Sequence, residues 1–68
     1  MLKQIDIIIP AHNEEGNILP IYNELRSILD GVHYEFKILF IDDGSNDKTI
    51  ELIKELSRND PKVKYIEL

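Results

Sequence analysis

Three apolar segments alternate with two amphipathic segments along this chain. The apolar segments are dominated by β-branched, aromatic and aliphatic residues, as in Ile7-Ile8-Ile9 and in Ile38-Leu39-Phe40-Ile41. Such unbroken runs are typical of parallel strands that are covered on both faces. The expected strands cover residues 4–9, 35–41 and 63–68. We expect Pro10 to end the first strand because proline cannot donate to a strand ladder.

The two segments between these strands repeat apolar residues at three- and four-residue spacing, which predicts helices with one apolar face. The first helix is expected to be capped near Asn17 and ended by Gly31, with Pro20 in its first turn, where backbone amides are unpaired. Its apolar stripe comprises Ile18, Ile21, Tyr22, Leu25, Ile28 and Leu29. The second helix is expected over residues 47–58, with Ile50, Ile53 and Leu56 facing inward and a cap from Ser45, Asn46 or Asp47.

The element order βαβαβ predicts an α/β fold with a Rossmann-like parallel sheet. Crossovers between parallel strands are right-handed in about 98% of cases, so two successive crossovers in one direction leave both helices on one face of the sheet. The other face is then bare, although the strand runs favour cover on both sides. We therefore expect the chain to be the opening half of a doubly wound domain, and to self-associate through the uncovered sheet face.

Size and composition limit the classes of function. A chain of 68 residues forms at most one small domain, and at this size folding buries only about 60% of the unfolded surface. The net charge of −5 and the scattered lysines argue against nucleic-acid binding. The absence of cysteine is typical of an intracellular protein. We expect a cytoplasmic location, with any membrane association supplied by segments outside this sequence, because no apolar run is long enough to span a bilayer.

Asp42 and Asp43 are the most informative candidates for chemistry, because they end the second apolar run and are followed by Gly44. Ligands of open α/β sheets bind just outside the carboxyl ends of the strands, where these acids are expected to lie. A dinucleotide-binding fold would also have a glycine-rich first loop, which is missing here. That loop instead contains Glu14 and Glu15, which would repel a diphosphate. The pattern favours recognition of a nucleoside, with the phosphates bound elsewhere.

Other classes fit the acidic pair less well. In a phosphoacceptor receiver domain the paired aspartates follow the first strand, and a third acid follows the third strand, whereas this pair follows the second. A calcium-binding loop is weaker still, because Gly44 comes too early after Asp42. A non-catalytic α/β binding or interaction module remains an alternative.

Two segments about thirty residues apart together resemble family 2 glycosyltransferases. The segment Ile9-Pro10-Ala11-His12-Asn13-Glu14 is similar to the family's "hydrophobic, Pro, x, aromatic, Asn, Glu" opening. The segment Asp42-Asp43-Gly44-Ser45-Asn46-Asp47-Lys48-Thr49 is similar to its "Asp-Asp-Gly-Ser-x-Asp-x-Thr" turn. The combination is most like polyprenyl-phosphate sugar transferases, such as the dolichyl-phosphate mannose synthases and undecaprenyl-phosphate glycosyltransferases.

The resemblance implies that residues 1–68 form the N-terminal, nucleotide-binding part of a GT-A domain. The residues it assigns to the nucleotide pocket are Pro10, His12, Glu14, Ile41 and Asp43, while Asp42 orients the turn. Carboxylates suit this task because they accept hydrogen bonds from a base imino group or from sugar hydroxyls. The family usually has Tyr or Phe where this chain has His12, which leaves the identity of the base open.

The resemblance also implies partners and a cofactor. The donor would be a nucleoside-diphosphate sugar, and the acceptor a lipid phosphate, most simply a polyprenyl phosphate, or a glycan. The family binds a divalent metal, Mg²⁺ or Mn²⁺, through an Asp-x-Asp motif that would follow Leu68 after further strands. We therefore expect no catalytic residue and no metal ligand within residues 1–68, and no transfer activity from this chain alone.

Overall fold

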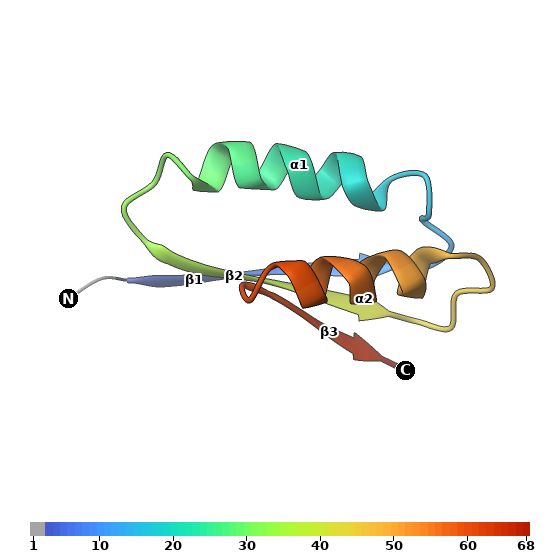
Figure 1. Ribbon diagram of the computed structural model, residues 1–68. Helices are drawn as coiled ribbons and strands as arrows, with labels where there is room; N and C mark the ends of the chain where they lie inside the picture. The colour runs from blue at the N-terminus through green and yellow to red at the C-terminus, as the bar shows by residue number, and fades with distance from the viewer. Residues whose placement is uncertain (1–2) are drawn as a thin grey trace.

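The computed structural model describes residues 3–68, which form a three-stranded sheet and two helices (Figure 1). The elements are β1 (Gln4–Ala11), α1 (Ile18–Leu29), β2 (Glu35–Asp42), α2 (Thr49–Asn59) and β3 (Val63–Glu67). The strands are parallel in the order β1-β2-β3, with Ile7 opposite Ile38 and Ile38 opposite Val63. The predicted α/β class and βαβαβ order are confirmed.

Both helices lie on the same side of the sheet, as the handedness of the crossovers predicts (Figure 1). Between them and the sheet is a core of fully buried side chains from β2, β3 and the helices, which includes Ile18, Ile38, Phe40, Ile53 and Val63. Burial alternates along β2, because successive side chains of a strand point to opposite faces. The layer is therefore held together by apolar packing on one face of the sheet.

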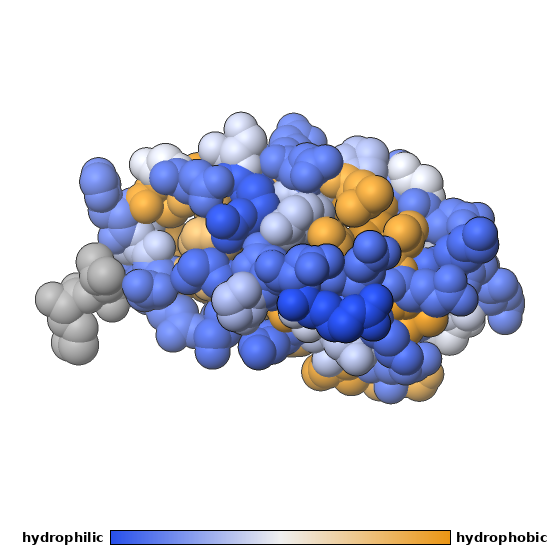
Figure 2. Space-filling model, in the orientation of Figure 1, coloured by the Kyte–Doolittle hydropathy of each residue, from blue (hydrophilic) through white to orange (hydrophobic). Residues whose placement is uncertain are grey.

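The expectation that the sheet face away from the helices is bare is confirmed for the residues that the structure describes. Ile8 on β1 is 60% exposed and Ile66 on β3 is 46% exposed, and both belong to the face opposite the helices. Figure 2 shows apolar surface at the lower edge of the molecule, beneath the carboxyl end of β3. The unbroken apolar runs thus supply one buried face and one exposed apolar face.

All three strands end one or two residues away from the predicted position, and β3 ends at Glu67 instead of Leu68. β1 continues through Pro10 to Ala11, and proline is tolerated there because β1 is at the edge of the sheet, where an outward-facing position needs no N–H donor. β2 ends at Asp42, so the first acid of the pair belongs to the strand.

The helices also differ in detail. α1 begins after Asn17 as expected, but the Asn17 side chain makes no cap hydrogen bond and donates to the Glu14 carboxylate at 2.7 Å. Ile28, expected in the apolar stripe, is 60% exposed. α2 begins at Thr49, two residues later than predicted. Within residues 3–68, no helix combines the length and the apolar character that crossing a bilayer requires.

Candidate functional site

A pocket of about 350 Å³ lies at the carboxyl ends of β1 and β2. Its lining comprises Pro10, Ala11, His12, Glu14, Ile41, Asp43 and Leu68. The structure thus brings together, in one pocket, all five residues that the sequence assigned to a nucleotide site. Asp42, the secondary residue of that assignment, does not line the pocket.

The register of β1 and β2 explains which side chains reach the pocket. Ala11 and Asp42 are paired across the two strands and are buried toward the helices. Since side chains alternate along a strand, the preceding pair, Pro10 and Ile41, points to the opposite face, where both line the pocket. The pocket therefore has apolar side chains on its strand side and the polar groups of the two following loops at its rim.

Asp42 has a different environment from that of its neighbour. Its side chain is only 2% exposed and accepts a hydrogen bond from the Ser45 hydroxyl. Gly44, between them, has a φ of 68°, a left-handed conformation that glycine adopts without steric cost. Asp43 is exposed and lines the pocket. The two acids are thus separated by geometry, one fixing the turn and the other free to contact a ligand.

The loop after β1 is bound to the loop after β2 through three successive backbone amides. The N–H groups of Asn13, Glu14 and Glu15 donate to side-chain oxygens of the second loop and the first residue of α2. The acceptors are Ser45 Oγ at 2.9 Å, Thr49 Oγ1 at 2.8 Å and Asp47 Oδ2 at 3.3 Å, respectively. Sequence reasoning considered Ser45 and Asp47 only as caps of α2 and assigned no role to Thr49. The signal it missed is the alternation of three oxygen-bearing side chains at positions 45, 47 and 49.

Three further hydrogen bonds run between the same two segments. Asn13 Oδ1 accepts from the N–H of Asn46 at 2.7 Å, and the Asp43 N–H donates to the Ala11 carbonyl at 3.0 Å. His12 Nδ1 lies 2.7 Å from the carbonyl oxygen of Asp43. Because a carbonyl can only accept, the proton of this bond is on Nδ1. Side-chain and main-chain hydrogen bonds therefore join the two loops that form the rim of the pocket.

Asp47 accepts hydrogen bonds both from the first residue of α2 and from the loop after β1. Its Oδ1 accepts from the Thr49 N–H at 2.9 Å and from the Thr49 hydroxyl, while Oδ2 accepts from Glu15. The Thr49 hydroxyl, followed by the backbone N–H groups of Thr49 and Glu15, lowers the pKa of Asp47 and outweighs the opposing effect of desolvation. Lys48 occupies the N-cap position of α2, so the predicted cap is wrong, and Asp47 is instead a structural carboxylate that joins the two loops.

Metal binding needs several ligands close together. Among residues 3–68, no group of three or more His, Cys, Asp or Glu side chains is arranged to hold an ion. The two carboxylates that line the pocket, Glu14 and Asp43, do not by themselves fit a divalent cation, which takes six or more oxygen ligands.

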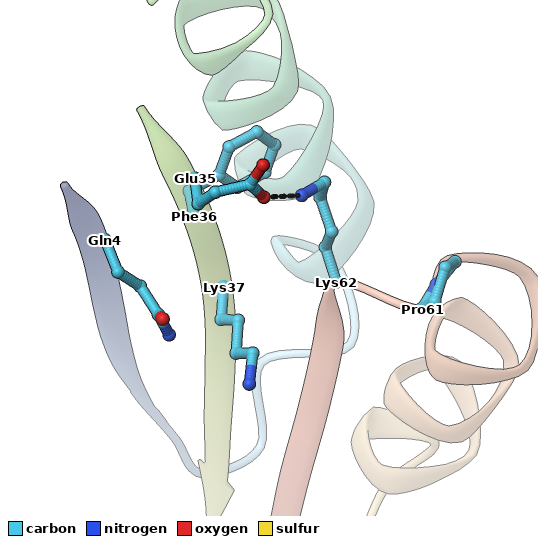
Figure 3. Close-up of a pocket in the computed structure, with 6 residues that line it drawn as sticks. All are labelled: Gln4, Glu35, Phe36, Lys37, Pro61 and Lys62. Atoms are coloured by element: carbon cyan, nitrogen blue, oxygen red, sulfur yellow. Dashed lines mark hydrogen bonds and ion pairs between the residues drawn. The ribbon is translucent and has the colours of Figure 1, made fainter. Parts of the chain in front are cut away.

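A second pocket, of about 340 Å³, lies at the opposite end of the strands (Figure 3). There Lys62 Nζ forms an ion pair with Glu35 at 3.2 Å and lies 4.7 Å from the centre of the Phe36 ring. The Lys62 charge in this second pocket is therefore already paired with Glu35 and with the Phe36 ring. Since ligands of parallel sheets bind at the carboxyl ends of the strands, the first pocket is the candidate site.

Comparison with known proteins gives a consistent result. The family model "Glycosyl transferase family 2" matches residues 6–68. A putative glycosyltransferase of Bacillus subtilis, CsbB, is 44% identical over 62 residues, which are 91% of this chain and 19% of the relative. The uncharacterized glycosyltransferase YkcC of B. subtilis is 39% identical over 64 residues, 94% of this chain and 20% of the relative. A bactoprenol glucosyl transferase of Shigella phage SfV is 38% identical over 60 residues, 88% of this chain and 20% of the relative. The chain thus spans about a fifth of the length of these relatives.

Proposed function

The chain belongs to glycosyl transferase family 2, and we propose that its pocket binds the nucleoside of a nucleoside-diphosphate sugar. The observation that carries the proposal is the meeting of two motifs in one pocket. Pro10, His12 and Glu14 come from the first motif and Ile41 and Asp43 from the second, and all five line the same space. Strand pairing places Pro10 beside Ile41, and the loop residues join them at the carboxyl end of the sheet, where ligands of open α/β sheets bind.

The chemistry of the pocket suits a nucleoside better than a phosphate. Pro10, Ile41 and Leu68 offer an apolar surface on which a flat base can lie. The carboxylate of Asp43 can accept a hydrogen bond from a base imino group or a ribose hydroxyl, and Glu14 offers a second acceptor. Two carboxylates at the rim would repel the diphosphate, which is therefore expected to point away from the pocket.

The acceptor in the complete enzyme is proposed to be a polyprenyl phosphate. The support is the similarity to proteins named bactoprenol glucosyl transferase, which cover 88% of this chain at 38% identity. A lipid-linked acceptor implies that the enzyme works at a membrane surface, with which other parts of the polypeptide would associate.

The 68-residue chain by itself is proposed to be inactive. A diphosphate leaving group needs charge neutralisation, which a divalent metal supplies, and the described residues do not form a ligand set for one. Mg²⁺ or Mn²⁺ would be held by residues outside this chain. Incubation of the purified chain with radiolabelled UDP- or GDP-sugars, polyprenyl phosphate and either metal should give no labelled lipid. Labelled product above the boiled control would overturn this proposal.

Nucleotide binding can be tested directly on the purified chain by ¹H–¹⁵N NMR titration. UDP and GDP, added separately, should shift the amides of His12, Glu14 and Asp43, and leave those of the distant Glu35–Lys37 segment in place. Inorganic pyrophosphate is the matched control, because it supplies the phosphates without the nucleoside. No shift with either nucleotide, or equal shifts with pyrophosphate, would contradict a nucleoside pocket and favour the alternative of a non-catalytic interaction module.

A further inference from the structure

Asn13 has an unusual backbone conformation in the loop after β1, between two residues that line the candidate pocket. Among residues 3–68 it is the only non-glycine residue with a positive φ, 53°. Asparagine is one of the few residues that adopt this left-handed region readily. The bend of the chain at Asn13 lies directly between His12 and Glu14, which both line the candidate pocket. The direction in which these two side chains leave the loop therefore depends on Asn13.

Asn13 contacts the second loop through both its main chain and its side chain. Its N–H donates to Ser45 Oγ at 2.9 Å, and its Oδ1 accepts from the Asn46 N–H at 2.7 Å. Its Nδ2 lies 3.4 Å from His12 Nε2, at the long end of hydrogen-bond range. Asn13 thus binds the loop after β1 to the loop after β2 by two hydrogen bonds. Asn13 itself does not line the pocket.

We propose that Asn13 is a positioning residue that holds the two acidic walls of the pocket, Glu14 and Asp43, in place relative to each other. This inference rests on the proposed nucleotide-binding function. Asn13 acts through two of its properties, the left-handed backbone and the side-chain oxygen that accepts from Asn46. Without the oxygen, the loop after β2 loses a bond on the side of Asp43. Without the left-handed backbone, Glu14 leaves the first loop in another direction.

Two substitutions test the side-chain oxygen while they keep the left-handed backbone. Asn13→Gly keeps the freedom to adopt a positive φ but removes the oxygen. Asn13→Asp keeps an oxygen in the same position and a residue type that tolerates the left-handed region. Asn23→Ala is the matched control, since Asn23 is an exposed residue of α1 away from both loops. Dispersed NMR spectra and unchanged circular dichroism establish first that each variant is folded.

The nucleotide that shifts the wild-type spectrum is then titrated into each variant. Loss of one hydrogen bond predicts that Asn13→Gly binds about fivefold to tenfold more weakly. Asn13→Asp and Asn23→Ala are expected to bind within about twofold of the wild type, which is inside the normal scatter of surface substitutions. Hydrogen exchange gives a second readout: the Asn46 amide should exchange faster in Asn13→Gly, while the amide of the buried Ile53 exchanges at the wild-type rate.

Equal binding by wild type and Asn13→Gly would overturn the inference, and so would Asn13→Asp binding as weakly as Asn13→Gly. Unchanged exchange of the Asn46 amide in Asn13→Gly would also overturn it. If the wild type does not respond to any nucleotide, the proposed function fails instead, and the exchange of Asn46 still reports whether Asn13 couples the loops.

Discussion

The N–H of Glu14 donates a hydrogen bond to the Thr49 hydroxyl at 2.8 Å, across 35 positions of sequence. The same hydroxyl donates to the Asp47 carboxylate. Thr49 is the first residue of α2 and is 0% exposed. A single buried hydroxyl therefore links the start of α2, the Asp47 carboxylate and the loop that forms one wall of the candidate pocket.

Replacing Thr49 with Val should destabilise the chain by about 2 kcal/mol, because the half-buried Glu14 N–H and one oxygen of Asp47 both lose a partner while the volume is kept. Thr49→Ser keeps the hydroxyl and should cost clearly less, with only a methyl group lost. Urea unfolding followed by circular dichroism measures both differences. Equal losses for Val and Ser would mean that packing, and not the hydroxyl, is what Thr49 contributes.

Tyr22 and Asp60 form a second link, which joins α1 to the turn before β3. The Tyr22 hydroxyl donates to Asp60 Oδ2 at 2.7 Å, and the Lys62 N–H donates to Oδ1 at 2.9 Å. Burial alone would raise the pKa of Asp60, but the Tyr22 hydroxyl, the Lys62 N–H and the Arg26 charge together lower it. Burial, followed by the hydrogen bond to Asp60, raises the pKa of Tyr22.

These shifts predict the pH dependence of stability. An Asp whose pKa is lowered on folding stabilises the fold above its unfolded pKa of about 3.9, and this contribution is lost as the pH falls through the lower folded value. Asp60→Asn should therefore be less stable than wild type at neutral pH, and the difference should shrink below about pH 4. Parallel urea titrations at neutral and acidic pH measure it. A difference that is constant with pH would exclude a contribution from the Asp60 charge.

Tyr22→Phe is expected to cost about 1.5 kcal/mol at neutral pH, since it removes a hydrogen bond to a charged group. The raised pKa of Tyr22 means that its contribution is present below pH 10 or so and is lost as the pH rises through the folded value. The stability difference between Tyr22→Phe and wild type should accordingly disappear in strong alkali. A matched substitution, Tyr34→Phe, removes an exposed hydroxyl and should have little effect.

The fold was largely predictable because its signals are local or nearly so. The apolar runs and the three- and four-residue spacing identified every strand and helix, and the handedness of crossovers placed both helices on one face. The errors occurred where tertiary context decides. Pro10 remains within β1 because β1 is an edge strand, and Ile28 is exposed because the face it occupies has no neighbour to cover it.

The residues that share the candidate pocket could be predicted from the sequence, whereas the hydrogen bonds between its two loops could not. His12, Glu14 and Asp43 were identified from two recognisable segments, and they share a pocket. The bonds between the two loops join residues about 32 to 35 positions apart, and such pairings have no local periodicity by which a single sequence could reveal them. Ser45 and Asp47 were therefore assigned to the turn and the cap alone, and Thr49 was assigned no role.

The uncovered sheet face predicts self-association of the 68-residue chain. Ile8 and Leu39 are neighbours on this face, flanked by Lys64 on β3. Asp6 lies on β1, the opposite edge strand, so a two-fold axis along β2 would bring Asp6 of each copy toward Lys64 of the other.

Sedimentation equilibrium should show a concentration-dependent dimer that Ile8→Lys weakens. Leu19→Lys, at an exposed apolar residue of α1, is the control; a monomeric wild type at high concentration would contradict the prediction.

Asp42 and Asp43 are adjacent acids with opposite predicted effects. Asp42→Asn should lower the free energy of unfolding by about 2 kcal/mol, because the Ser45 hydroxyl loses a charged acceptor at a buried position. Asp43→Asn should leave stability almost unchanged, since its side chain is exposed, yet weaken nucleotide binding by about tenfold if its carboxylate accepts from the nucleoside. Urea unfolding and NMR titration of both variants give the two quantities. If Asp42→Asn weakened nucleotide binding and Asp43→Asn lowered stability, the ligand contact would be assigned to Asp42. If both variants lost binding equally, the pocket would depend on the turn as a whole rather than on the Asp43 carboxylate.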